Sequence, residues 1–319
     1  MVQQLQANGV KTKETPVKDV RFINSNTQAV GLDEMRNGHL IPVFVKDNEQ
    51  IISHQQLVDT TYEVADDIFG DLDAPALRVS HPVKGRIPSA RDKKVADLQP
   101  NEKTVYYERM AFLIDIPNIT QTVNGQELSL TVGGVRALNQ ENLYSFKGIE
   151  KFKIFIGFKV SVCTNLCIST DGYSDVIRVS SPDELSAKIR ELLSGYNMEN
   201  DLKFYKNMQD YALSEQQFAN MIGRAKMYPF LSKADREKVP ALQLGEYHFN
   251  TVVKEYYKDN HFGRNDDGSI DMWKLYNLFT SANKGSYIDT FLERGVNAFS
   301  FTQNIGNALE NKTSNWFLN

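Results

Sequence analysis

An alternation of apolar and polar residues between Lys151 and Ser169 constrains the fold of this chain more than any other feature. Every even position in this stretch except Thr164 is apolar, which is the period of two typical of a strand with one buried face. The opposite face carries the lysines Lys151, Lys153 and Lys159. The pattern predicts one long strand and, if no other element covers that second face, a basic row upon it.

Local signals on either side of this strand predict both helices and strands. Ser53, followed three residues later by Gln56, forms a capping box that begins a helix ending at Gly70. Asn124-Gly125 joins two strand-like segments and is the dipeptide that favours a tight hairpin turn. Beyond residue 180 the pattern predicts helices that begin at the cap Ser181 and continue over residues 199–211, 214–227, 244–257, 271–281 and 287–309.

These elements predict an α+β fold in which an antiparallel β-meander with an N-terminal helix precedes a mostly helical C-terminal half. Residues 1–38 are polar and lack periodicity, so we expect a flexible N-terminal arm there. Residues 39–180 form the β-rich region, which is expected to begin with a strand at residues 39–46 and to contain an irregular, proline-rich loop at residues 71–100. Residues 181–319 form the helical region.

The composition is that of a soluble globular protein, with 41% hydrophobic and 24% charged residues. No stretch approaches the roughly 20 apolar residues that cross a membrane, and the N-terminus lacks the apolar core of a secretory signal. We therefore expect a cytoplasmic protein without a membrane partner. The formal net charge of −4 weighs against a general nucleic-acid coat protein but leaves room for a local basic patch.

The segment from residue 78 to residue 94 is strongly basic within this acidic chain. It contains six basic residues and one acidic residue, and the basic ones are Arg78, Lys84, Arg86, Arg91, Lys93 and Lys94. Such a segment suits contacts with nucleic-acid phosphates. Two alternatives are a solvated loop that keeps the protein soluble and a surface for a protein partner.

The basic row of the long strand is the second candidate for nucleic-acid binding. A sheet face that presents Lys151, Lys153 and Lys159, with Tyr106 or Tyr107 nearby, would form a platform for single-stranded DNA, where lysines neutralise phosphates and aromatic rings stack on bases. The alternatives are that helices after residue 180 cover this face or that it is an ordinary solvated sheet face.

Catalytic motifs are not apparent in the sequence. There is no G-x-S-x-G, Walker or H-E-x-x-H motif, and the five histidines lack metal-ligand spacing. The segment from Gly263 to Asp271 approaches a calcium loop, but Lys274 occupies the position that requires a bidentate acid. We therefore predict a protein that is not an enzyme and needs neither cofactor nor metal.

Two segments resemble an uncharacterised family of phage- and plasmid-like proteins of mobile elements. The family pattern is matched by Val162, Cys163, Asn165, Trp273, Tyr276 and Asn277. Residues 39–59 are similar to a branch of that family found in anaerobic gut bacteria and their phages. The resemblance implies a mobile-element protein, located in the host cytoplasm if a phage encodes it, and it implies no established activity.

The predicted order of helix, three-stranded meander and helix also resembles the core of single-strand annealing proteins. That resemblance implies binding of single-stranded DNA in recombination or replication, with self-association into a homo-oligomer that extends the binding groove. The alternative function is an accessory protein that binds a host protein, such as a defence antagonist, with the basic segment incidental. Steep salt dependence of binding favours the first function, and an exposed apolar patch favours the second.

Overall fold

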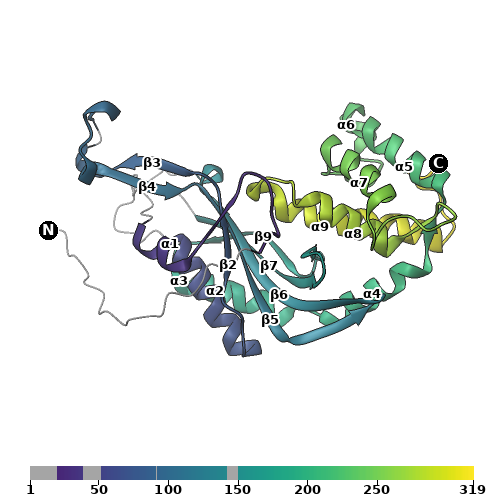
Figure 1. The fold of residues 1–319 in the computed structure, drawn as a ribbon, viewed down its shortest axis with the longest axis horizontal. Coiled ribbons are helices and arrows are strands. Elements are labelled where there is room, and N and C mark those ends of the chain that lie inside the picture. The colour runs from purple at the N-terminus through teal and green to yellow at the C-terminus, as the bar shows by residue number, and fades with distance from the viewer. Residues whose placement is uncertain (1–19, 39–51, 91, 142–149) are drawn as a thin grey trace.

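The computed structural model of the protein describes residues 20–38, 52–90, 92–141 and 150–319. In this part of the chain a seven-stranded antiparallel sheet has helices on both faces and a helical region at one end (Figure 1). The strand order is β1-β2-β5-β6-β7-β8, and β9 also pairs with β7. The predicted α+β class is confirmed. The strands are β1 Gln28–Val30, β2 Ala76–Val79, β5 Arg109–Val123, β6 Gln126–Ala137, β7 Glu150–Val160, β8 Leu166–Cys167 and β9 Tyr173–Val179.

Strands β5 and β6 form the hairpin that the sequence predicts. Asn124 has φ 49° and Gly125 has φ 76°, and positive φ at both central residues is the requirement of a tight type I′ turn. Asn and Gly adopt this conformation at lower cost than other residues, which explains why the turn falls at this dipeptide. The ladder shifts register between Ile116 and Thr120, where β5 bulges.

The two faces of the sheet belong to separate apolar cores, because alternate residues of a strand point to opposite faces. The even-numbered residues between 110 and 116 of β5 and between 152 and 160 of β7 join the main core, under helices α2 (His54–Phe69) and α3 (Pro182–Gly195). Odd-numbered residues such as Leu113 and Phe155 join a second core with the first turn of α9 (Ile288–Glu310). Figure 1 shows α9 on the side of the sheet opposite α2.

Helices α2 and α3 begin at the caps that the sequence predicts. The Ser53 hydroxyl accepts from the Gln56 N–H at 3.0 Å, and the Gln56 side chain accepts from the Ser53 N–H at 2.7 Å. The Ser181 hydroxyl accepts from the Glu184 N–H at 3.2 Å in the same way. A short helix, α1 (Leu32–Gly38), precedes them in the chain.

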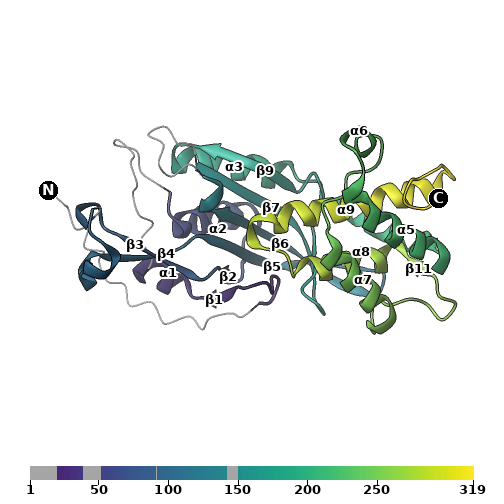
Figure 2. The same ribbon diagram turned by 90° about the horizontal axis from the view of Figure 1, so that it is seen from above.

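The helices predicted beyond residue 180 are confirmed within a few residues. They are α3, α4 (Met198–Asn207), α5 (Glu215–Met227), α7 (Glu246–Lys258), α8 (Met272–Asn283) and α9, with a short α6 (Lys233–Arg236) between α5 and α7. A two-stranded ladder of β10 (Ala212–Leu213) and β11 (Ile270–Asp271) pairs the segment before α5 with the segment before α8. The long helix α9 starts over the sheet and ends among the other helices (Figure 2), so it connects the two regions.

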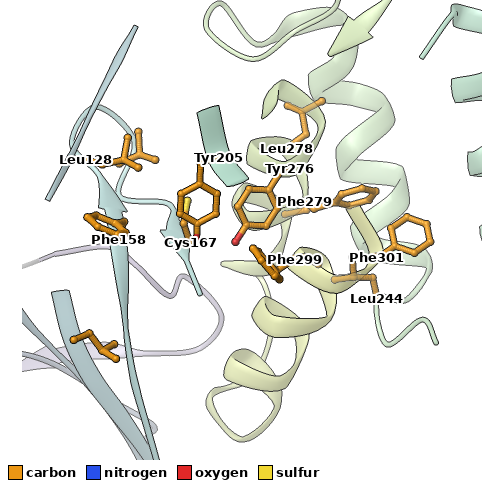
Figure 3. Close-up of a cluster of buried hydrophobic side chains, with 14 of the residues drawn as sticks. Leu128, Phe158, Cys167, Tyr205, Leu244, Tyr276, Leu278, Phe279, Phe299 and Phe301 are labelled. Atoms are coloured by element: carbon orange, nitrogen blue, oxygen red, sulfur yellow. The ribbon is translucent and has the colours of Figure 1, made fainter. Parts of the chain in front are cut away.

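Aromatic side chains continue the main core from the sheet into the helical region (Figure 3). Phe158 of β7 meets Tyr205 of α4 edge to face, with ring centroids 6.4 Å apart. Tyr205 in turn stacks on Tyr276 of α8 at 6.0 Å, and Phe299 of α9 lies edge-on to Tyr276 at 6.2 Å. Each of these four side chains is almost completely buried, so one continuous core holds both regions together.

Three expectations from the sequence differ from the structure. Residues 20–38 of the predicted flexible arm contain β1 and α1, and β1 pairs with β2 at the edge of the sheet. The predicted irregular loop at residues 71–100 contains β2 and a further strand described below. The predicted strand at residues 151–169 stops at Val160, turns with Thr164 at φ 57°, and returns as β8. The strand predicted at residues 39–46 lies outside the described residues.

His248, at the start of α7, is a buried histidine that folding keeps neutral. Its Nδ1 accepts from the Gly245 N–H at 3.1 Å, and its Nε2 lies 2.8 Å from the Ser286 hydroxyl. Burial, and then the positive charge of Arg294, lower the pKa of His248 to about 4. As the pH falls, the His248 side chain is therefore protonated near pH 6.5 in the unfolded chain but only near pH 4 in the folded protein.

We expect His248 to make the protein less stable in mild acid. The free energy of unfolding should fall between pH 6.5 and pH 4 by about 3 kcal/mol from this group, since each pKa unit is worth about 1.4 kcal/mol. Urea unfolding across this range should show a shallower pH dependence for His248→Gln, while the exposed His261→Gln serves as control. An unchanged pH dependence in His248→Gln would contradict this assignment.

Candidate nucleic-acid interface

Strands β3 (Pro82–Arg86) and β4 (Lys103–Tyr107) form a two-stranded hairpin that projects from the sheet, at the end of the molecule away from α5 to α8 (Figures 1 and 2). Lys84 pairs with Val105 and Arg86 pairs with Lys103. Directly opposed residues of an antiparallel pair share a face, and residues two apart in a strand do so as well. Lys84, Arg86 and Lys103 therefore form a basic row on one face of the hairpin.

The end of this hairpin is a small folded unit. Between the strands lie three short 3-10 turns, at Pro88–Ala90, Val95–Asp97 and Pro100–Glu102. Ala90 and Leu98 are buried within this end. Lys93 and Lys94 are exposed, as is Val95 with 67% of its surface accessible. The end of the hairpin thus carries an apolar side chain next to two lysines.

Internal hydrogen bonds hold the end of the hairpin in shape. Arg86 donates to the Lys93 carbonyl, and the Lys93 ammonium pairs with Glu102. The Gln99 N–H also donates to Glu102, at 2.9 Å, and these hydrogen bonds lower the pKa of the Glu102 carboxyl. Some hydrogen-bond donors of Arg86 and Lys93 are therefore already used within the protein.

The base of the hairpin is anchored by Tyr107, which is 2% exposed. Its hydroxyl donates to Glu34 of α1 at 3.1 Å and accepts from Gln28 of β1 at 3.2 Å. Its carbonyl lies 2.8 Å from Nε2 of His54, at the start of α2. Contacts with three separate elements at this one residue fix the direction in which the hairpin projects.

The hairpin has a charge opposite in sign to that of the whole chain. Residues 82–107 contain six basic and three acidic side chains, a net charge of +3, whereas the full chain carries −4. The remainder of the chain therefore carries −7. A cationic projection on an anionic protein directs polyanions to one place on its surface. Arg91, one of the six basic residues, lies outside the described residues.

Arg78 does not belong to the hairpin, although the sequence groups it with the basic segment. It lies in β2 and is 7% exposed. Its Nη2 donates to the carbonyl and the hydroxyl of Thr27, each at 3.0 Å. The structure therefore separates Arg78 from the exposed lysines and places it at the β1–β2 edge.

Helix α9 lies over part of the sheet, so the structure matches the alternative in which helices after residue 180 cover the lysine face of β7. Lys153 pairs with Glu293 of α9 and donates to the Asp289 carbonyl at 2.9 Å. Lys159 pairs with Asp115 of β5, across the intervening strand β6. Lys151 donates to a backbone carbonyl, that of Gln140, at 3.0 Å. These three lysines are engaged in contacts within the sheet or with α9 and do not form the exposed platform for single-stranded DNA.

One basic residue of this interface is not indicated by the sequence pattern. Lys103 lies beyond the segment 78–94, and only strand pairing places it beside Arg86. The alternation from Lys103 to Tyr107 is too short to specify a partner strand by itself. Pairing of residues separated by a 16-residue connection is a property of the fold that sequence periodicity does not reveal.

The described part of the chain contains neither a group of metal ligands nor a membrane-spanning helix. Within it, no three His, Cys, Asp or Glu side chains are grouped so that they could hold a metal ion. None of its helices is both long and apolar enough to cross a membrane. The two cysteines, Cys163 and Cys167, are free thiols.

Comparison with known proteins assigns the chain to a family. A family model described as "Domain of unknown function, B. Theta Gene description (DUF3871)" matches residues 4–318. The chain belongs to this family. The expected membership of an uncharacterised family is thereby confirmed, and the DUF3871 model covers both the sheet and the helical region. No curated protein and no solved structure matches. Membership of DUF3871 supplies no activity, so a functional proposal has to rest on the geometry of the chain.

Proposed function

We propose that this DUF3871 protein is a non-enzymatic mobile-element protein that binds single-stranded DNA in recombination or replication, with the β3–β4 hairpin as its main contact. The observation that carries the proposal is the basic row Lys84, Arg86 and Lys103, continued by Lys93 and Lys94, on a projection of net charge +3. Lysine and arginine on such a surface neutralise phosphates and release counterions, and this release supplies most of the affinity in sequence-independent DNA binding.

The order of elements supports single-stranded DNA as the ligand. Helix α2, the meander β5-β6-β7 and helix α3 occur in this order along the chain, with β2, β3 and β4 before the meander and β8 and β9 after it. This order resembles that of single-strand annealing proteins. The resemblance to phage- and plasmid-like proteins supports a mobile-element origin. In this proposal the hairpin holds the backbone, and a homo-oligomer presents several hairpins along one strand.

Removing exposed lysines from the hairpin should weaken DNA binding in a salt-dependent way. Lys84, Lys94 and Lys103 are all exposed, so Lys84→Ala, Lys94→Ala and Lys103→Ala can be combined without disturbing the core. If each lysine contacts one phosphate, the slope of log K against log salt should become shallower by about 2, since each contact contributes about 0.7 on single strands. Fluorescence anisotropy of labelled single- and double-stranded DNA across a salt series measures this.

The matched control removes three lysines from the helical region of residues 181–319. Lys188, Lys238 and Lys254 have side chains that are 57%, 72% and 63% exposed, and their ion pairs at the surface contribute little to stability. The control variant has the same net charge as the hairpin variant. Equal weakening by both variants would show that only overall charge matters, and it would contradict the hairpin as the contact.

A second candidate function is binding of a host protein, and one observation favours it. Met227 at the end of α5 and Phe230 in the following turn are 56% and 89% exposed. Exposed apolar side chains next to each other are typical of protein interfaces. A host protein that stays bound at high salt, and that no longer binds the Phe230→Ser variant, would favour this function over DNA binding.

A further inference from the structure

A cavity of about 700 Å³ lies where the β1–β2 edge of the sheet meets the turn between α8 and α9. Its lining gathers three basic residues from distant parts of the chain, Arg21, Arg78 and Lys284. Among the described residues that line it, none is Asp or Glu. The lining also includes Cys163, and burial raises the pKa of this thiol, so it adds no negative charge at pH 7.

Arg78 is held rigidly at this cavity. Its Nε and Nη2 donate to the Thr27 hydroxyl at 3.1 and 3.0 Å, and Nη2 also donates to the Thr27 carbonyl. Thr27 is fixed in turn, because its hydroxyl donates to the Ile23 carbonyl at 3.1 Å. A guanidinium held in this way loses little side-chain entropy when a ligand binds.

Lys284, at the end of α8, brings a second buried positive charge to the cavity. It is 9% exposed, and its ammonium donates to the Cys163 carbonyl. Burial lowers the pKa of Lys284, while the charge of Asp259, which does not line the cavity, acts in the other direction. The Cys163 carbonyl is an uncharged hydrogen-bond partner for this buried ammonium, so an anion in the cavity would stabilise the charge further.

Two hydrogen bonds join the segments that carry these groups. The Asn24 N–H donates to the Lys284 carbonyl at 2.7 Å, and the Thr164 hydroxyl donates to the Arg21 carbonyl at 3.2 Å. The segment that carries Arg21 is thus attached both to the α8–α9 turn and to the turn after β7. The Arg21 residue itself is exposed, which places a third positive charge where a ligand enters.

We propose that this cavity binds a phosphate group, supplied either by the backbone of DNA or by a free nucleotide. Arginine and lysine are the residues that bind phosphate oxygens most strongly, through charge-assisted hydrogen bonds. Arg78 precedes Pro82, the first residue of the hairpin, by only four positions. The cavity is therefore close in sequence to the base of the hairpin. If the phosphate comes from DNA, this proposal rests on the proposed function. If it comes from a free nucleotide, it does not.

The test measures phosphate binding directly. Inorganic phosphate, thymidine monophosphate and a thymidine oligonucleotide are titrated into the full chain by calorimetry at constant ionic strength. Arg21→Gln should weaken binding of all three about tenfold or more, because a hydrogen bond to a charged group is lost. Lys284→Met should do the same, and exposed Arg21 remains the informative position if the buried Lys284→Met fails to fold. Arg190→Gln, an exposed arginine of α3 remote in sequence, is the control.

The titrations distinguish this proposal from the proposed function. The hairpin variant combines Lys84→Ala, Lys94→Ala and Lys103→Ala. Phosphate binding that is lost in Arg21→Gln and kept in the hairpin variant supports the cavity as the phosphate site, whether or not the protein binds DNA. In the hairpin variant, an oligonucleotide that binds more tightly than the monophosphate identifies DNA as the source of the phosphate, and a monophosphate that binds more tightly identifies a free nucleotide. Wild-type protein that binds DNA through the hairpin, yet binds inorganic phosphate no better than Arg21→Gln does, would overturn the cavity proposal alone.

Discussion

Replacing Arg136 with Met is expected to lower the free energy of unfolding by about 3–5 kcal/mol. The Arg136 side chain is completely buried in β6, and its Nε lies 3.0 Å from Glu141 while its Nη2 lies 3.1 Å from Glu150. Its guanidinium also lies over the Phe152 ring, 4.8 Å from the centroid. Met fills much of the same volume, so the loss should come mainly from two carboxylates left buried without their cation. Chemical denaturation at pH 7 measures it.

The surface pair of Arg190 and Asp67 provides the control for Arg136. Their side chains are 49% and 64% exposed, and an exposed pair of this kind contributes about 0–1 kcal/mol. Arg190→Met should therefore leave stability nearly unchanged. Combining Arg136→Met with Glu141→Gln and Glu150→Gln should recover part of the loss, since the unpaired charges are then removed. If Arg136→Met changes the free energy of unfolding as little as Arg190→Met does, the buried ion pairs of Arg136 with Glu141 and Glu150 do not stabilise the protein as we describe.

Phe158→Ala is expected to cost about 3–5 kcal/mol as well, through a cavity in the core. Phe158 is fully buried in β7 and packs edge to face on Tyr205, so the cavity would open where the sheet meets α4. The same substitution at Phe230, which is 89% exposed, should change stability by less than about 0.5 kcal/mol. Thermal and urea unfolding of the two variants compare these values.

The aromatic contact itself can be separated from burial by a double-mutant cycle. Phe158→Ala and Tyr205→Ala, alone and combined, should show a coupling energy of about 0.5–1.5 kcal/mol beyond simple additivity. Additive losses would mean that the two rings contribute only through the area that each buries. The cycle would then contradict the edge-to-face contact as the link between the sheet and the helices.

The elements that the sequence predicts well are those with local signals. The capping residues Ser53 and Ser181 fix the starts of α2 and α3 because the hydrogen bonds that they make are to residues three positions away. Asn124-Gly125 fixes the long hairpin for the same reason, since its turn conformation is a property of two adjacent residues. Distant context does not alter such signals, and they agree with the structure within a few residues.

The elements that the sequence does not predict depend on distant partners. The ion partner of Lys153 is Glu293, 140 residues away, and that of Lys159 is Asp115, 44 residues away. Periodicity shows that these lysines share a face of β7, but it does not show that α9 covers part of that face. The projecting hairpin escapes prediction for a related reason, because the prolines around it predict a loop while pairing with β4 makes residues 82–86 a strand.

The central claim is that the β3–β4 hairpin contacts DNA, and a map of cross-links tests it most directly. Single-stranded DNA that carries photoreactive thymidine analogues is bound at low salt, irradiated and digested, and the attached peptides are identified by mass spectrometry. We predict that cross-links concentrate in residues 82–107 and disappear in the variant that lacks Lys84, Lys94 and Lys103. Cross-links confined to α5–α8, or bound DNA without any cross-link to the hairpin, would contradict it.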